Sequence, residues 1–439
     1  MFEKLRTIFQ IPELRRRVLF TLGLFVVYRL GEHLPTPGVN ARALQGAFES
    51  QRGNLFGLYD LFVGGAFSRA TVFALGIMPY ISSSIILQLL GAVVPYFEKL
   101  RKEGEEGQKK LTQITRYGTV LISIIQSFAY SVFLINLGAS QGLSVVPHPG
   151  PLFSLSTIIT QTAGTIFVMW MGEKITEHGI GNGISLIIMV NILGALPNRA
   201  LSAYESFRAG TVSILVVLVC LAVMVAVIAA VVAITQGVRK IPVQYAKRIV
   251  GRRMYGGANT HIPLRVNTAG VIPIIFASSL LILPTTVAGF FKTGPLAELG
   301  TWFNPLGPVY NILYAILIVG FTYFYTAVVL NPNDLAENMR KYGGFIPGIR
   351  PGRKTAEYID RVLSRITLPG AIFLALIAVL PDVMIAWMKV PFLGFGGTSV
   401  LIVVGVALDT LQQIESHMIM RHYEGFVKQG RIRGRTQRM

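Results

Sequence analysis

The sequence predicts an all-α membrane protein with ten transmembrane helices, and three observations lead to this prediction. Hydrophobic residues make up 52% of the 439 residues, whereas charged residues make up 14%, against about 25% in ordinary soluble domains. Apolar runs of a length that crosses a bilayer as a helix recur ten times. Basic residues gather in alternate connections. This composition excludes a soluble enzyme, a disordered tail and a secreted disulfide scaffold, and the single cysteine, Cys220, has no partner within one copy.

The ten apolar segments are predicted to be helices because a backbone in lipid must satisfy its own hydrogen bonds. They lack the apolar/polar alternation that an outer-membrane barrel requires. One of them, 183–197, is short for a span. The segments cover approximately residues 18–34, 70–94, 117–137, 152–172, 183–197, 211–235, 269–291, 309–330, 367–388 and 398–415.

The distribution of positive charge sets the predicted orientation. Of the 40 lysines and arginines, 32 fall in the two ends of the chain and in every second connection, and 8 fall on the other side. Because basic connections stay in the cytoplasm, both the segment 1–17 and the basic tail 416–439 are expected there. The net charge of +19 is therefore first a sign of topology, before any partner is considered.

A short apolar segment between the first two spans, residues 58–69, has no counterpart elsewhere in the chain. It is too short to cross the membrane, and Gly64-Gly65 would break a helix there. One interpretation is a half helix that enters the membrane, surrounded by protein or by a water-filled cavity. The other is an external loop packed on the helix bundle.

Two connections on the basic side are large enough to form structures of their own. In 236–268, two strand-like runs, 239–245 and 261–267, flank the turn signal of 256–259 and predict a basic hairpin. In 331–366, Asn331-Pro332-Asn333 opens a short helix that Gly343-Gly344 closes, and 355–366 forms a second, amphipathic helix. Contact with anionic lipid is one explanation of such charge. The size of both connections favours a large acidic partner, such as ribosomal RNA or an acidic protein face.

Several kinds of chemistry have no residues to carry them. The spans hold almost no ionisable side chains at mid-depth, which an ion-driven transporter normally has. No nucleotide-binding loop occurs, and the histidines lie in connections or at span ends, so neither an ATPase nor an intramembrane protease is expected. We predict no catalytic residue, no metal site and no cofactor. The glycines of 179–183 are expected to let a helix begin tightly against a neighbour.

The polar residues inside the spans are mild ones. They either join neighbouring helices by hydrogen bonds or line a boundary that opens. Isoleucines at helical spacing accompany them near mid-span, Ile81 with Ile85 and Ile184 with Ile188. The polar set comprises Ser82, Ser83, Ser84, Gln88, Asn191, Thr268, Ser278 and Ser279.

Several motifs together closely resemble the SecY family, the central channel subunits of the bacterial Sec protein translocon. The resemblance covers essentially the whole chain, and its longest motifs are very specific. They are the runs 64–70, 73–82, 171–185, 251–253, 269–273, 345–352 and 396–399.

The resemblance implies two inverted halves of five spans, 18–205 and 206–415, and a lateral gate formed by the second, third, seventh and eighth spans. It implies that Ser82, Ser83, Ser84, Gln88, Thr268, Ser278 and Ser279 line that gate. The plug would be Tyr59, Asp60, Leu61, Phe62, Val63, Gly64, Gly65, Ala66, Phe67, Ser68 and Arg69. The pore ring would be Ile81, Ile85, Ile184, Ile188, Ile275 and Ile402. Branched apolar side chains can seal a pore and still rotate aside for a passing chain.

The resemblance also implies a function and partners. A channel of this family passes unfolded polypeptides across the bacterial cytoplasmic membrane and releases membrane segments sideways. The implied partners are the small subunits SecE and SecG, the SecA ATPase motor, the ribosome, signal peptides and anionic lipids, with Arg252, Arg253 and Arg350 at the docking positions. The alternative is a secondary transporter of peptides or lipids, which would need a site at mid-membrane.

Overall fold

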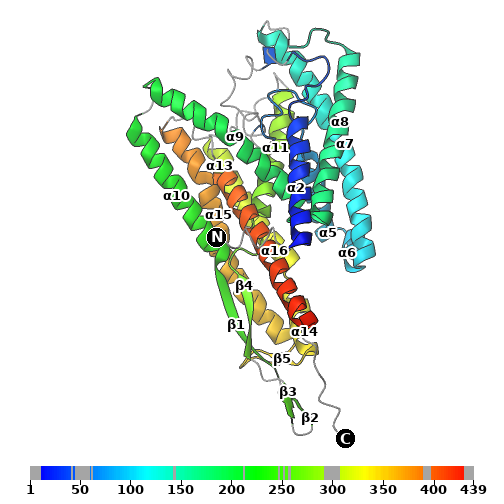
Figure 1. The fold of residues 1–439 in the computed structure, drawn as a ribbon, viewed down its shortest axis with the longest axis vertical. Helices are drawn as coiled ribbons and strands as arrows, with labels where there is room; N and C mark the ends of the chain where they lie inside the picture. Colours follow the sequence, from blue (N-terminus) through cyan, green and yellow to red (C-terminus); the bar gives the residue numbers. More distant parts are fainter. Residues whose placement is uncertain are drawn as a thin grey trace.

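The computed structural model shows a tall helical bundle with a small group of β-strands at one end (Figure 1). We call this end the strand end and the opposite end the plug end. The structure describes residues 11–40, 43–44, 60, 63–141, 145–210, 213–245, 248–250, 253–255, 259–290, 307–388 and 397–429. Residues 1–10 of the predicted cytoplasmic segment 1–17 lie outside these residues.

A helix lies on each of the ten predicted segments. Seven of the described helices are long and apolar enough to cross a membrane, or eight if the bent pair α5 and α6 counts as one span. The ten helices are α2 (Pro12–Gly31), α5 (Met78–Val93), α7 (Glu105–Gln141), α8 (Pro151–His178), α9 (Gly183–Arg208), α10 (Ile214–Gln236), α11 (Ile272–Phe290), α13 (Pro308–Val329), α15 (Arg353–Met388) and α16 (Gly397–Gln429).

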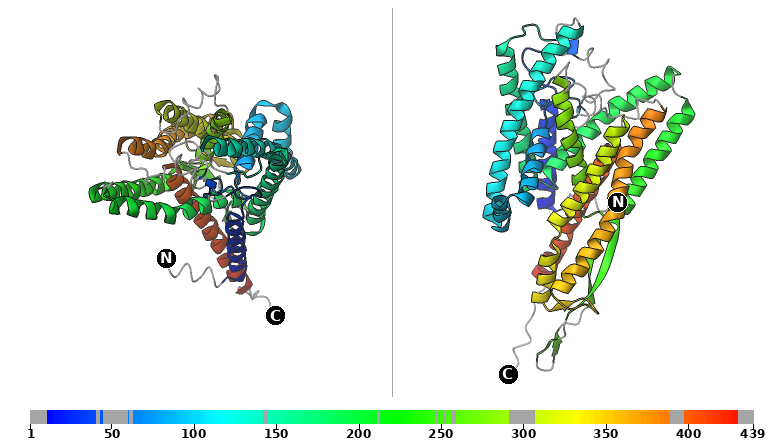
Figure 2. Two further views of the ribbon diagram at one scale, coloured as in Figure 1. Left: turned by 90° about the horizontal axis from the view of Figure 1, so that it is seen from above. Right: turned by 180° about the vertical axis from the view of Figure 1, so that it is seen from behind.

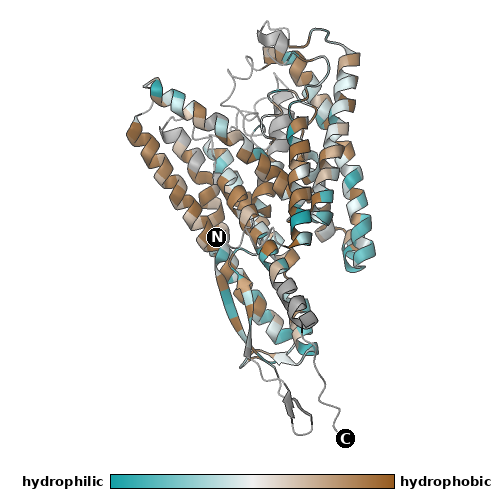
Figure 3. Cartoon of the chain, in the orientation of Figure 1, coloured by the Kyte–Doolittle hydropathy of each residue, from teal (hydrophilic) through white to brown (hydrophobic). Residues whose placement is uncertain are grey.

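Successive long helices run in opposite directions, so that α2 begins and α16 ends toward the strand end (Figures 1 and 2). Apolar residues cover the outside of α10, whereas hydrophilic residues gather on the strands and on the short helix α6 (Pro95–Lys102) (Figure 3). This division agrees with a bundle that crosses a bilayer and projects its strand end into water.

Two helices are longer than the sequence suggested. Helix α9 continues through Pro197 to Arg208, so the prediction of a short fifth span was wrong. A proline removes one backbone donor and bends a helix without always ending it. The two helices expected at 355–366 and 367–388 are one, α15, which continues through Pro369 and Gly370 at the junction of its amphipathic and apolar stretches.

The two large connections meet in one three-stranded sheet with the order β4-β1-β5. Strands β1 (Val238–Tyr245) and β4 (Asn259–Arg265) form the expected hairpin, with Val238 opposite Arg265. Between them the chain adds a second hairpin, β2 (Arg248–Val250) with β3 (Arg253–Tyr255), which the single predicted turn at 256–259 did not include. Strand β5 (Gly344–Phe345) pairs with the end of β1.

A separate hydrophobic core holds the strand end together. It packs the sheet against α15 and the short helix α14 (Pro332–Lys341), which Asn331 caps as predicted by accepting a hydrogen bond from Asn333 N at 3.1 Å. Its buried members are Ile241, Val243, Leu264, Met339, Ile346, Ile359 and Leu363. The two basic connections are therefore one folded unit.

Candidate pore, plug and gate

The six predicted ring isoleucines come from four helices and enter one buried apolar cluster. Helices α5, α9, α11 and α16 supply them, and the cluster also includes residues of the plug. Ile184 is partly buried, and the other five are at most 5% exposed. Branched apolar side chains buried in this way are suited to exclude water from a constriction.

The start of α9 places two of the ring residues. Asn182 caps the helix, because its side-chain oxygen accepts hydrogen bonds from Ile184 N at 3.1 Å and Ser185 N at 3.3 Å. Gly183 lies directly against the backbone carbonyl of Gly172 in α8, where a Cβ would collide. The glycines therefore allow α9 to begin tightly against its neighbour, as the sequence analysis expected, and this fixes where Ile184 and Ile188 project.

From residue 63 to residue 69 the candidate plug is a chain of tight turns. Asp60 accepts two hydrogen bonds from within the segment. Its carboxylate accepts one from Ser68 N at 2.8 Å, and its backbone carbonyl accepts one from Gly65 N at 2.9 Å. Gly64 and Gly65 have φ values of 70° and 86°, a region that glycine adopts at little cost. Tyr59, Leu61 and Phe62 lie outside the described residues.

The plug is anchored to the bundle by both apolar and polar contacts. The ring of Phe67 lies 4.6 Å from that of Tyr130 in α7, between centroids, and Tyr130 donates a hydrogen bond of 2.7 Å from its hydroxyl to the carbonyl of Phe67. Val63 and Ala66 are at most 1% exposed. The plug is thus buried against the same cluster that contains the ring isoleucines.

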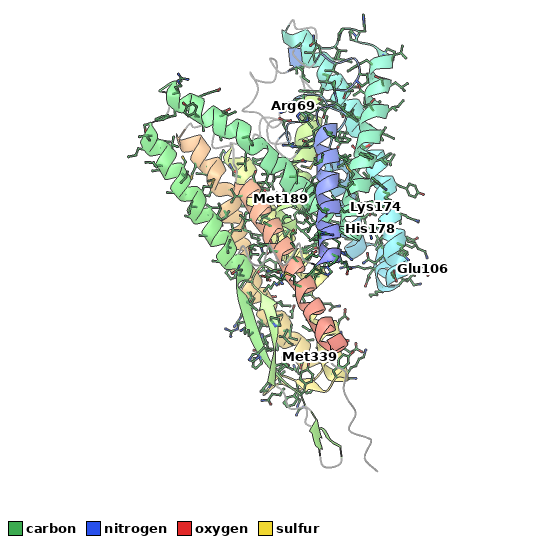
Figure 4. The ribbon with its side chains drawn as sticks, in the orientation of Figure 1. Arg69, Glu106, Lys174, His178, Met189 and Met339 are labelled. Atoms are coloured by element: carbon green, nitrogen blue, oxygen red, sulfur yellow. The ribbon has the colours of Figure 1, made fainter. Side chains whose placement is uncertain are left out.

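A buried ion pair lies beside the plug. Arg29 and Glu32, at the end of α2, form it, and the side chain of Glu32 is only 1% exposed. Arg29 lies directly against Gly194 of α9, and a Cβ on Gly64 would come within 2.9 Å of the Glu32 carboxylate. Arg69 also interacts electrostatically with Glu32 and lies toward the plug end, whereas Lys174 and His178 lie toward the strand end (Figure 4).

The predicted gate residues form several small groups rather than one polar line. Ser83 donates to the carbonyl of Thr115 at 2.9 Å and so joins α5 to α7, while Ser84 accepts from Gln88 within α5. Ser279 of α11 contacts α5, because its hydroxyl lies 3.9 Å from the Met78 sulfur. Of the remaining residues, Ser82 is buried, Ser278 bonds to Ile275 in its own helix, and Thr268 bonds to Arg265 just before α11.

At the strand end, α7 and α8 are joined by an ion pair. Arg116 donates two hydrogen bonds to the Glu173 carboxylate, at 2.9 and 2.7 Å. The hydrogen bond to Glu173 raises the pKa of the Arg116 guanidinium above its ordinary value. This bidentate contact holds the third span of the gate against its neighbour within the first half of the chain.

Two of the three predicted docking residues are among the described residues, and both lie on the strand-end unit. Arg350 is exposed between β5 and α15, and its carbonyl accepts a hydrogen bond from the Thr355 hydroxyl at 2.9 Å. Arg253 begins β3, in the hairpin beyond the sheet. Arg252 lies outside the described residues.

The sequence analysis missed three contributors to this site. Tyr130 was not singled out because its role depends on the position of the plug, 63 residues earlier in the chain. The pair of Arg29 and Glu32 was not singled out either, although both residues lie near the end of the first predicted span. Their separation of three residues could have suggested an ion pair, but nothing in the local sequence indicated that the pair lies beside the plug.

Comparison with known proteins agrees with this geometry. The SecY family model matches residues 71–411, which is more than half of the chain. The chain belongs to the SecY family. It is 45% identical over 429 residues to the protein translocase subunit SecY of Aquifex aeolicus, covering 98% of this chain and 100% of that protein. It is 46% identical over 426 residues to SecY of Escherichia coli, covering 96% of each.

Solved structures share the fold at much lower identity. A protein-conducting channel matches with a TM-score of 0.67 at 17% identity, over 94% of this chain and 96% of that one. Sec61 in a canine ribosome–channel complex matches with a TM-score of 0.63 at 18% identity, over 94% and 96%. The SecY-family chain is thus a channel subunit of a protein translocase rather than an enzyme, and the transporter alternative is not favoured.

Proposed function

We propose that the chain forms a pore for unfolded polypeptides that is sealed by the six ring isoleucines and closed from one side by the plug at 58–69. The observation that carries this proposal is that the ring isoleucines of four helices and the described plug residues belong to one buried apolar cluster, which extends through the whole bundle. A pore that accepts any sequence cannot depend on specific hydrogen bonds or fixed charges. An apolar constriction that excludes water meets this requirement.

The seam of α5 and α7 against α11 and α13 serves as the lateral gate in this proposal. Apolar contacts and the weak approach of Ser279 to Met78 hold it at mid-depth, so little free energy is needed to separate the helices. The apolar part of a signal peptide could then pass between pore and lipid. The two halves, 18–205 and 206–415, move relative to each other in this process.

The strand-end unit is the proposed docking site for a motor or a ribosome. Support comes from its joined basic connections and from the relatives, since one structural neighbour is described as Sec61 in a ribosome–channel complex. By family resemblance we assign SecA as motor, SecE and SecG as small subunits, and anionic lipids as the surrounding surface. The chain then lies in the bacterial cytoplasmic membrane, with both ends in the cytoplasm.

Substitution of a ring residue tests the seal with a matched control on the same helix. The reconstituted wild-type protein, with its small subunits and motor, should first render a signal-bearing precursor inaccessible to protease. Ile85→Gly should then raise the resting ion conductance, because it opens a gap in the constriction. Ile86→Gly should not, because Ile86 is 44% exposed on the outside of α5. Equal conductance in the two variants and the wild type would refute the seal.

A cross-link tests the plug. In a background with Cys220→Ala, cysteines that replace Phe67 and Phe133, whose rings lie 6.0 Å apart between centroids, are joined by a short reducible linker. We expect translocation to stop and to recover after reduction. Undiminished translocation with the linker in place would show that 58–69 does not leave the pore.

A further inference from the structure

The end of α13 contains a backbone carbonyl that its own helix cannot satisfy. In an α-helix, the carbonyl of Val328 would accept a hydrogen bond from the backbone nitrogen of residue 332. Residue 332 is a proline and carries no N–H. The hydrogen bond of the helix two residues earlier is intact, since Leu330 N donates to Thr326 O at 2.9 Å. The Val328 carbonyl therefore needs a donor from outside the helix or from water.

Arg101 supplies that donor from a segment 227 residues away. Its Nη2 lies 2.9 Å from the Val328 carbonyl oxygen. A cation at a helix C-terminus also meets the negative end of the helix dipole, and a charged donor makes a stronger hydrogen bond than a neutral one. Arg101 further interacts electrostatically with Tyr325, on the preceding turn of α13. The contact is thus favoured by hydrogen bonding and by charge.

Helix α6, which carries Arg101, is tied to both first-half helices of the gate. It follows α5 after a bend of 98°. Its Leu100 is 4% exposed, and Gly107 of α7 lies directly against the Leu100 carbonyl. Because α6 is held by α5 and α7 together, any movement of these helices away from α13 must displace Arg101.

A second, longer-range charge interaction acts between α6 and α14. Lys102 forms an ion pair with Glu98 of its own helix at 2.6 Å and also interacts electrostatically with Asp334 in α14. Other cations of this connection behave differently, since Lys109 and Lys110 pair only with acids one turn before them in α7. Orientation in the membrane requires cations in the connection, but it does not require any of them to reach α13 and α14.

We propose that Arg101 is a latch that holds the strand end of the lateral gate closed by binding the Val328 carbonyl. The proposal rests on the gate proposed above and adds to it a residue outside the membrane. The bond is accessible to water, so its contribution is modest. A latch of this strength can be released when a partner binds the strand-end unit, of which α14 is a part.

The test compares two charge-neutralising substitutions on α6. The full chain is reconstituted with its small subunits in planar bilayers, and the resting ion conductance is measured. Arg101→Gln should raise the conductance by about fivefold, because losing an exposed hydrogen bond worth about 1 kcal/mol changes an equilibrium by about that factor. Lys99→Gln removes the same charge from an exposed position of the same helix and should leave the conductance unchanged. Equal conductance in both variants would overturn the latch.

Two further measurements separate failure of the latch from failure of the gate or of folding. The Arg101→Gln variant should translocate more of a precursor with a defective signal than wild type does. As a control, the wild-type protein must translocate a precursor with an intact signal. If the wild-type protein fails this control, the proposed channel function is wrong, and not only the latch. Next, Lys102→Cys and Asp334→Cys are joined by a short reducible linker in a Cys220→Ala background. The linker should return the Arg101→Gln variant to wild-type conductance and block translocation until it is reduced. Translocation through the linked protein would refute the proposal.

Discussion

Individual polar atoms hold the candidate plug in the position that the structure shows. The hydroxyl of Tyr130 and the carbonyl of Phe67 are both buried, and each would lose a partner if the other moved away. The carboxylate of Asp60 has the same role within the plug, where it holds Ser68 N. These bonds join segments that the apolar cluster alone would let slide, so they determine a single position for the plug.

Loss of the Tyr130 hydroxyl should weaken the closed state. Tyr130→Phe keeps the ring against Phe67 but leaves the plug carbonyl without this donor, at a cost of about 1–3 kcal/mol. The resting conductance should rise about tenfold, since each 1.4 kcal/mol changes an equilibrium by about that factor. Tyr117→Phe, on the same helix and 77% exposed, is the control. A rise in both variants would attribute the effect to α7 rather than to the hydrogen bond.

The close contact between α8 and α9 can be tested by a substitution at Gly183. Gly183→Ala would place a Cβ on the carbonyl of Gly172, and the required shift should cost about 1–3 kcal/mol of stability. A lowered midpoint of thermal unfolding in detergent would report it. Gly320→Ala in α13 meets nothing within 4 Å and should leave the midpoint unchanged or slightly raised. An unchanged midpoint for Gly183→Ala would show that α9 can move away at no cost.

Whole elements were predictable where one physical requirement dominated. Hydropathy located all ten helices, because only a helix satisfies its backbone in lipid, and strand alternation with turn residues located β1 and β4. Their lengths were less predictable, since Pro197 lies within α9 and α15 continues from water into the membrane. The ring isoleucines followed from family resemblance. The contacts of Tyr130 with the plug and of Arg101 with α13 depend on distant segments, and no local pattern carries them.

The core of the strand end should be separable from the pore. Ile359 of α15 is fully buried there, so Ile359→Ala should cost about 2–5 kcal/mol of local stability. Limited proteolysis should then cut the strand-end unit faster, and motor or ribosome binding should weaken, while resting conductance stays at the wild-type level. Ile372→Ala, at a 46% exposed position of the same helix, should change none of these. A rise in conductance with Ile359→Ala would show that the unit also closes the pore.

Across the whole molecule, charge and apolar surface are divided between regions. The large buried cluster of the bundle consists of apolar side chains, while the strand-end unit combines two connections that each carry seven lysines and arginines. Strands from both connections form one sheet, and this sheet leads into α11 through β4 and lies next to α15 in the chain. A partner bound there can therefore act on α11, a helix of the proposed gate, and on α15 without entering the membrane.

Reversal of charge at the proposed docking positions should therefore weaken association without affecting insertion. Replacement of Arg252, Arg253 and Arg350 by Glu should lower affinity for motor or ribosome at least tenfold at low salt, because like charges then face an acidic surface. The difference from wild type should shrink as ionic strength rises and screens exposed charges. Arg208→Glu, an exposed reversal at the end of α9, should bind as wild type does. Normal binding by the triple variant would exclude this face as the docking site, and the latch at Arg101 would then require another signal for its release.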